Sequence, residues 1–144
     1  MNDERTGNGG RGTGNGERAE VGTGQRTMRV GGDIAGRLLE LGVSAIRLAA
    51  RLPRDTAGRH VASQLVRSAT SGGANYEEAR AAESRSDFVH KVRIAAKEVR
   101  ETVYWLTVIE QLGWVRTQLG ALPLQANELA AILTASARTA RRNA

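Results

Sequence analysis

The fold is decided by residues 67–112, which read RSATSGGANYEEARAAESRSDFVHKVRIAAKEVRETVYWLTVIEQL. The second half of this stretch repeats apolar residues at spacings of four and three, as one buried face of an α-helix requires. Ser84 and Asp87 form a capping box before it, and Gly113 can end the helix in a left-handed conformation. The repeating residues are Phe88, Val92, Ala95, Val99, Thr102, Leu106 and Ile109.

The first half of the stretch leaves two interpretations open. Asp55 or Thr56 can cap a helix that carries Val61 and Leu65, but residues 70–73 read TSGG. On propensity alone these four residues break the helix. Alternatively the helix continues through them, and its small residues let a neighbouring backbone approach closely.

Two further helices are predicted outside the stretch. Upstream, Asp33 is a suitable N-cap, and Pro53 ends the helix because the residue before a proline avoids the α region. Leu39 and Ile46 are expected to widen its apolar face on one side. Downstream, Pro123 suits the first turn of a last helix. The residues expected on the inner faces are Ile34, Leu38, Leu41, Ala45, Leu48 and Leu52 in the first of these helices; in the last they are Leu129, Leu133, Ser136 and Ala140, with Ile132 and Ala135 beside them.

Four helices with short connections and one broad apolar face each most simply form an all-α, antiparallel up-down-up-down four-helix bundle. We expect residues 33–144 to form this bundle. Residues 1–32 hold 10 of the 17 glycines and almost no large apolar side chains, so they are expected to be a disordered tail. An RNA-contacting arm is the alternative for this tail, although its acids and its lack of aromatic residues favour a plain one.

Composition excludes several classes of protein. The chain has no cysteine, so disulfides and thiol chemistry are excluded. It has neither an apolar run of the roughly 18 residues that span a membrane nor the apolar segment of a signal peptide, and we expect it to be cytoplasmic. The net charge of +6 arises mainly after residue 32, where 16 Lys and Arg face 11 acids.

Four glutamates on two adjacent predicted helices raise the question of a metal site. Di-metal bundles use Glu-x-x-His pairs, and neither His60 nor His90 stands in one. The acids are therefore expected to pair with cations such as Arg67 and Arg80. Without a cysteine or a Gly-x-Ser-x-Gly elbow, nucleophilic catalysis also lacks support. We expect no enzyme activity, no metal and no cofactor. The four acids are Glu77, Glu78, Glu98 and Glu101.

Basic residues form the best functional pattern. Three of them, Arg93, Lys97 and Arg100, recur at i, i+4 and i+7, so one helix face can present all three. Such a face binds phosphates without reading sequence, although a solvated face interleaved with acids would look the same. Base-stacking aromatics are scarce, which disfavours sequence-specific reading of single strands. The candidate nucleic-acid-binding residues are Arg93, Lys97, Arg100, Lys91, Arg67 and Arg80.

Several motifs in the stretch resemble a known family. They are R-S-A-T-S-x-x-A-N at residues 67–75, S-R-S-D-F at residues 84–88 and E-T-x-Y-W-L at residues 101–106. They resemble bacterial four-helix-bundle proteins that include those encoded in intervening sequences of large-subunit ribosomal RNA genes and the accessory protein of diversity-generating retroelements. The resemblance implies a helix that continues through Gly72 and Gly73, and a homopentameric assembly. It also implies nucleic acid or a reverse transcriptase as partner.

The residues and the resemblance together predict a non-enzymatic homo-oligomer that binds RNA, DNA or a nucleic-acid enzyme through basic faces. The alternative is a scaffolding homo-oligomer that has a protein partner and binds no nucleic acid. Neither prediction involves a membrane or a small-molecule substrate.

Overall fold

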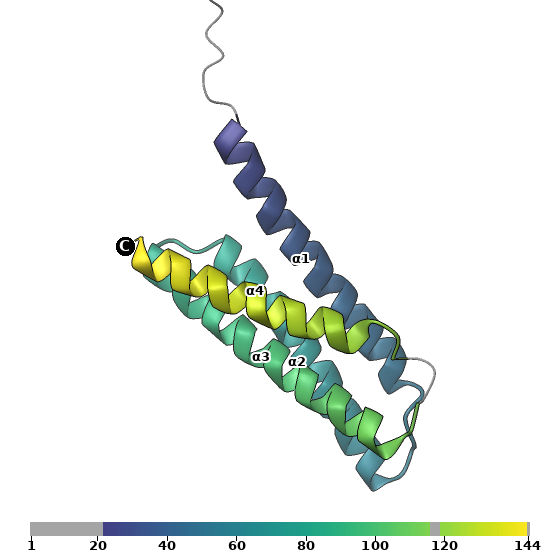
Figure 1. The fold of residues 1–144 in the computed structure, drawn as a ribbon. Coiled ribbons are helices and arrows are strands. Elements are labelled where there is room, and N and C mark those ends of the chain that lie inside the picture. Colours follow the sequence, from purple (N-terminus) through teal and green to yellow (C-terminus); the bar gives the residue numbers. More distant parts are fainter. Residues whose placement is uncertain (1–21, 116–118, 144) are drawn as a thin grey trace, which may run out of the picture.

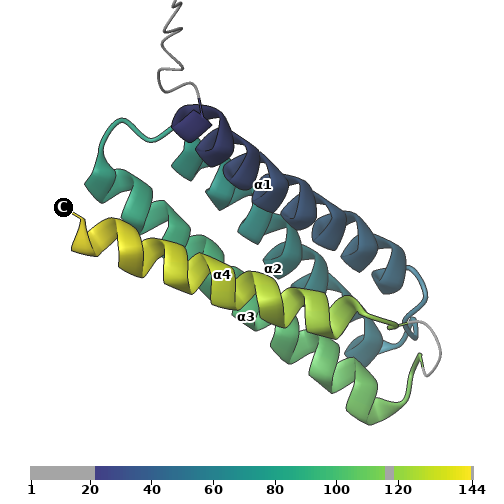
Figure 2. The ribbon, with the colours of Figure 1, turned by 45° about the horizontal axis from the view of Figure 1, so that its top comes forward.

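The computed structural model describes residues 22–115 and 119–143, with side chains from residue 31 onward. The four helices run alternately up and down, and α1 and α4 contact each other less than the other neighbouring pairs do (Figures 1 and 2). This arrangement confirms the predicted all-α four-helix bundle. The helices are α1 (Gly22–Ala49), α2 (Thr56–Arg80), α3 (Arg85–Leu112) and α4 (Leu122–Arg142).

Local signals fix most helix ends where the sequence predicts them. The Asp55 carboxylate caps α2 by accepting a hydrogen bond from the backbone N–H of Gly58 at 2.8 Å. The Ser84 hydroxyl accepts one from the backbone N–H of Asp87 at 3.1 Å, and this bond caps α3. At the other end of α3, Gly113 adopts the left-handed conformation with φ of 64°. These interactions satisfy backbone groups that a helix end leaves unpaired.

The start of α1 differs from the prediction. The helix begins at Gly22, whereas capping by Asp33 predicted a start eleven residues later. The segment before Asp33 reaches α2, because a Cβ atom on Gly31 would lie 3.6 Å from the Tyr76 hydroxyl. Residues 1–21 lie outside the described residues, so the disordered tail remains a prediction there.

The core lies where the helical periodicity places it. All six apolar residues predicted for the first helix are buried, although Leu52 lies beyond the end of α1 at Ala49. Six of the seven in α3 are buried, and Phe88 is partly buried. Leu39 and Ile46 widen the apolar face on one side, where they line a groove with Leu38, but their side chains are 68% and 50% exposed and not part of the core. They lie on a flank of α1 that no other helix of the bundle covers. In α4, Ala135 is likewise exposed, and alanines such as Ala126 complete the buried face.

The α2 helix is continuous through Thr70, Ser71, Gly72 and Gly73. Gly72 is buried against α3, and Gly73 faces Leu38 of α1. Small residues thus bring α2 close to both neighbours at the same level of the bundle. The continuous helix is confirmed, and the break that propensity favoured is wrong.

Candidate nucleic-acid interface

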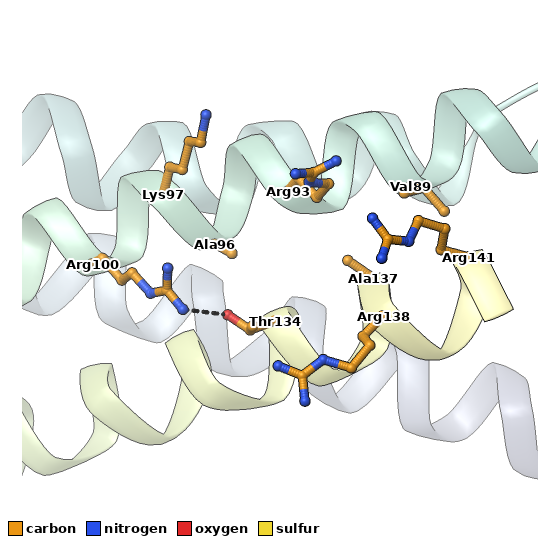
Figure 3. A pocket seen from close by; sticks show the side chains of 9 residues that line it. All are labelled: Val89, Arg93, Ala96, Lys97, Arg100, Thr134, Ala137, Arg138 and Arg141. Carbon is orange, nitrogen blue, oxygen red and sulfur yellow. Dashed lines mark hydrogen bonds between the residues drawn. The ribbon is translucent and has the colours of Figure 1, made fainter.

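A groove of about 240 Å³ lies between the first half of α3 and the second half of α4. Two buried alanines, Ala96 of α3 and Ala137 of α4, lie in it. Because these side chains are small, they leave room between the longer residues on either side. We call this feature the basic groove. It is lined by Val89, Arg93, Ala96, Lys97 and Arg100 of α3 and by Thr134, Ala137, Arg138 and Arg141 of α4 (Figure 3).

Five cations and no carboxylate line the basic groove. Arg100 Nη2 donates a hydrogen bond to Thr134 Oγ1 at 3.0 Å, which ties α3 to α4. Figure 3 shows Arg141 extending toward Arg93 across the groove, whereas Lys97 points away from α4. Like charges held together without acids produce a local positive potential that attracts anions. Within the described part of the chain, four of the five cations have neither an ion pair nor a side-chain hydrogen bond: Arg93, Lys97, Arg138 and Arg141.

The other three candidate residues lie elsewhere and are paired with acids. Arg67 of α2 binds both Glu98 and Glu101 of α3. Lys91 binds Glu78, and this hydrogen bond raises the pKa of Lys91. The remaining candidate is bound within its own helix, in the pair Arg80–Glu77 at 3.2 Å. The structure therefore brings Arg93, Lys97 and Arg100 together and places Arg67, Arg80 and Lys91 outside the basic groove.

The four glutamates that raised the question of a metal site are all in ion pairs with these three cations. No group of three or more His, Asp or Glu side chains suited to a metal ion occurs in the described residues. The hydrogen bond from Arg67 lowers the pKa of Glu101, and a second one from the indole of Trp105 acts in the same direction. In the described structure these four glutamates therefore act as ion-pair partners of basic side chains.

Sequence reasoning counted Arg138 and Arg141 among the basic residues of a nucleic-acid surface but did not select them as candidate binding residues, because cations near the end of a helix already suit its dipole. In an antiparallel bundle the end of α4 lies beside the start of α3, so both arginines line the same groove as Arg93; Figure 3 shows Arg141 extending toward Arg93 and Arg138 pointing away from α3. A signal was present in the sequence: Thr134, Arg138 and Arg141 step by four and three along one face of α4.

A second surface feature is apolar. A groove of about 480 Å³ lies between α1 and α2, and its most prominent side chains are Leu39, Val43 and Ile46. Glycines of both helices form part of its wall, among them Gly42 and Gly73. We call this feature the apolar groove. It accounts for three of the six large hydrophobic side chains that are exposed in the described structure.

The helices of the described part of the chain are too polar or too short to cross a membrane. Residues 33–135 match the family described as 23S rRNA-intervening sequence protein, and the chain belongs to this family. The matched region starts at Asp33, the predicted start of the bundle. No curated protein matches the chain at a significant level.

Among solved structures, the chain is similar to a Bacteroides thetaiotaomicron protein of unknown function from the S23 ribosomal protein family. The two share 32% sequence identity with a TM-score of 0.66, over 72% of this chain and 97% of the other. At this identity and coverage, the Bacteroides thetaiotaomicron protein is a relative of this chain, and the two proteins share the helical bundle.

Proposed function

We propose that the chain binds nucleic acid, without catalysis, through the basic groove between α3 and α4. The observation that carries this proposal is that five cations from two helices line one groove, and that no carboxylate is among the described residues lining it. A solvated face interleaved with acids was the other interpretation of the basic pattern. That interpretation fits Arg67, Arg80 and Lys91, which form ion pairs with glutamates. It does not fit the cations that line the basic groove.

The groove chemistry favours contact with the sugar-phosphate backbone. Its lining contains Arg, Lys, Thr, Ala and Val, so cations dominate it, and it lacks the Asn and Gln that read adenine and the aromatic rings on which bases stack. We therefore expect binding with little dependence on sequence and a strong dependence on salt. RNA is the nucleic acid to test first, because the family description refers to 23S rRNA.

A charge-reversal experiment tests the basic groove. We expect Arg93, Lys97 and Arg100, replaced together by Glu, to abolish RNA binding and to leave the helical circular dichroism signal intact. The matched control replaces Arg47, Arg54 and Arg59, which are exposed and outside the groove. It changes the net charge equally, so it separates a local site from overall charge. Undiminished binding of the first variant, or equal loss in both, would contradict the proposal.

We propose further that the chain self-assembles in the cytoplasm, as the homopentamer that the resemblance implies, and that a second copy covers the apolar groove. The segments outside the described residues are rich in Gly, Arg and other polar residues and offer few apolar side chains to fill it. The chain itself has other exposed apolar side chains, including Leu112 and Leu124, that a second copy could place there. Repetition of the basic groove in an assembly would raise affinity for a long polyanion through avidity.

Light scattering coupled to size exclusion tests the assembly. A mass near five chains is expected for the natural protein, and Leu39 and Ile46 replaced by Glu should lower it, because a charge in an apolar contact is costly to desolvate. As a control, Arg47→Glu adds a negative charge to α1 at a residue that does not line the apolar groove. A single-chain mass for the natural protein would contradict the proposal.

The second candidate function is a scaffold whose partner is a protein. The apolar groove favours it, because large exposed apolar patches mark protein contacts. Unaltered migration of RNA and DNA at low salt would favour the scaffold over nucleic-acid binding. A reverse transcriptase gene adjacent to the gene for this chain would support the partner that the retroelement resemblance implies.

A further inference from the structure

The row of cations on α3 continues into an aromatic residue. Arg93, Lys97, Arg100 and Tyr104 step by four, three and four, so they lie on one face of the helix. Tyr104 is 59% exposed, which is unusual for a large ring in this chain, where Tyr76 is buried. Long side chains on a helix lean toward its start, so the Tyr104 ring leans toward the turn that carries Arg100.

Neighbouring side chains position the Tyr104 ring. It packs edge-to-face against the Trp105 ring, with 4.9 Å between ring centroids and an interplanar angle of 76°. Trp105 is itself fixed, because its indole N–H donates to Glu101 at 3.2 Å and its ring meets that of His60 at 5.7 Å. Glu101 is the acid nearest to Tyr104 in sequence, and it forms an ion pair with Arg67. A ring that is already positioned loses less conformational freedom on binding.

Resting on the nucleic-acid binding proposed above, we infer that the site takes a strand with an unpaired base, which stacks on Tyr104 while the cations of α3 hold the adjacent phosphates. Arg100 and Tyr104 are separated by about 6 Å along the helix axis, roughly two base steps of 3.4 Å. A base inside a duplex presents no free ring face, whereas loops, ends and single strands do. Stacking on an aromatic ring is sequence-tolerant, in keeping with the phosphate binding proposed for the groove.

Fluorescence anisotropy with two labelled RNAs of equal length, one single-stranded and one a blunt-ended duplex, tests this inference. Tyr104→Ala should weaken single-strand binding about tenfold or more, since one stacked base contributes on that scale, and should change duplex binding little. Tyr104→Trp should keep the single-strand affinity. As a control, Gln125→Ala removes an exposed side chain of α4 that lies outside both the basic groove and this row, and it should have no effect.

The outcomes separate this inference from the proposed function. Single-strand affinity that survives Tyr104→Ala but is lost on charge reversal of Arg93, Lys97 and Arg100 would overturn the stacking site and leave the basic groove in place. Equal weakening of both RNAs by Tyr104→Ala would also overturn it, as would a fall in oligomeric mass, which would make Tyr104 a protein contact. A natural protein that binds neither RNA would overturn both proposals.

Discussion

Gly72 of α2 and Val99 of α3 approach so closely that a Cβ atom on Gly72 would lie 2.8 Å from Val99 Cγ2. Val99 is fully buried and β-branched, so its side chain has little freedom to move aside. The neighbouring Gly73 is different, because a Cβ atom there would meet Leu38 at an ordinary distance of 3.7 Å. Two adjacent glycines in one helix therefore have different roles.

The two glycines should respond oppositely to alanine. Gly72→Ala gains roughly 1 kcal/mol of helix propensity, but overpacking costs about 1–3 kcal/mol, so we expect a net loss of about 1 kcal/mol. Gly73→Ala should raise the free energy of unfolding by about 0.5–1 kcal/mol, because it gains propensity without a clash. Urea unfolding of both variants measures this difference. Equal stability of the two would contradict the close contact.

Gly58 at the start of α2 should tolerate no side chain. A Cβ atom there would lie 1.9 Å from the carbonyl oxygen of Pro53, and a backbone atom cannot rotate away. Relief requires the first turn to move, which would also weaken the cap that Asp55 provides. We expect Gly58→Ala to lower the free energy of unfolding by about 2–4 kcal/mol.

A matched control exists on α1. A Cβ atom on the exposed Gly36 would meet nothing within 4 Å. Gly36→Ala should therefore be stabilising, again through helix propensity. Thermal unfolding of Gly58→Ala and Gly36→Ala in parallel measures the difference. A shift of both midpoints in the same direction would contradict the prediction.

The sequence predicted what local chemistry decides. The ends of α3 follow from Ser84 and Gly113, which act on backbone groups a few residues away. The course of α2 through Gly72 and Gly73 did not follow from propensity, because the approach of Val99 from another helix is not encoded locally. It was the family resemblance that implied the continuous helix.

Periodicity also has a limit that α1 illustrates. It identifies an apolar face but not which element covers it, so it did not show that Leu39 and Ile46, which widen this face, are exposed. The basic groove illustrates the same limit, because periodicity within one helix does not show which residues of another helix lie beside it. Arg93 was a candidate from its own helix, whereas the contribution of Arg141 depends on how α4 lies beside α3 (Figure 3).

A buried hydroxyl pair links α2 and α3. The Ser68 and Thr102 hydroxyls are 3.0 Å apart, and both residues are fully buried. Replacing one partner alone leaves the other hydroxyl bonded only to a backbone carbonyl of its own helix, Leu65 for Ser68 or Glu98 for Thr102, and the lost bond costs about 0.5–1.5 kcal/mol. We expect Ser68→Ala combined with Thr102→Val to cost at least about 0.5 kcal/mol less than the two single variants added together. A double-mutant cycle in urea measures this coupling, and strict additivity would show that the hydroxyls do not depend on each other.

Acid should weaken the ion pair between Arg67 and Glu101. The hydrogen bond from Arg67 lowers the pKa of Glu101 in the folded protein. A lowered folded pKa stabilises the fold above the ordinary glutamate pKa of about 4.3, and this stabilisation is lost as the pH falls from there through the lowered value. The Arg67 and Glu101 side chains are 44% and 36% exposed, so solvent screening limits the contribution to about 0.2–1 kcal/mol.

The measurement is the free energy of unfolding of the natural protein and of Arg67→Gln from pH 6 to pH 3. The natural protein should lose more stability over this range than the variant. Arg80→Gln is the control, because its partner Glu77 is more exposed than Glu101 and its pair lies within one helix. Parallel pH profiles for the natural protein and Arg67→Gln would show that this pair does not contribute.

Two adjacent arginines at the end of α4 provide the sharpest test of the basic groove. Arg141 lines the groove (Figure 3). Arg142 is exposed but is not among the residues that line it. Each phosphate contact releases condensed counterions, so losing one contact should reduce the slope of log K against log salt by about 0.7–0.9. We expect this reduction for Arg141→Ala and no comparable change for Arg142→Ala, although both lose one positive charge. Equal slopes for the two variants would mean that RNA responds to the overall charge of the helix end and not to the groove.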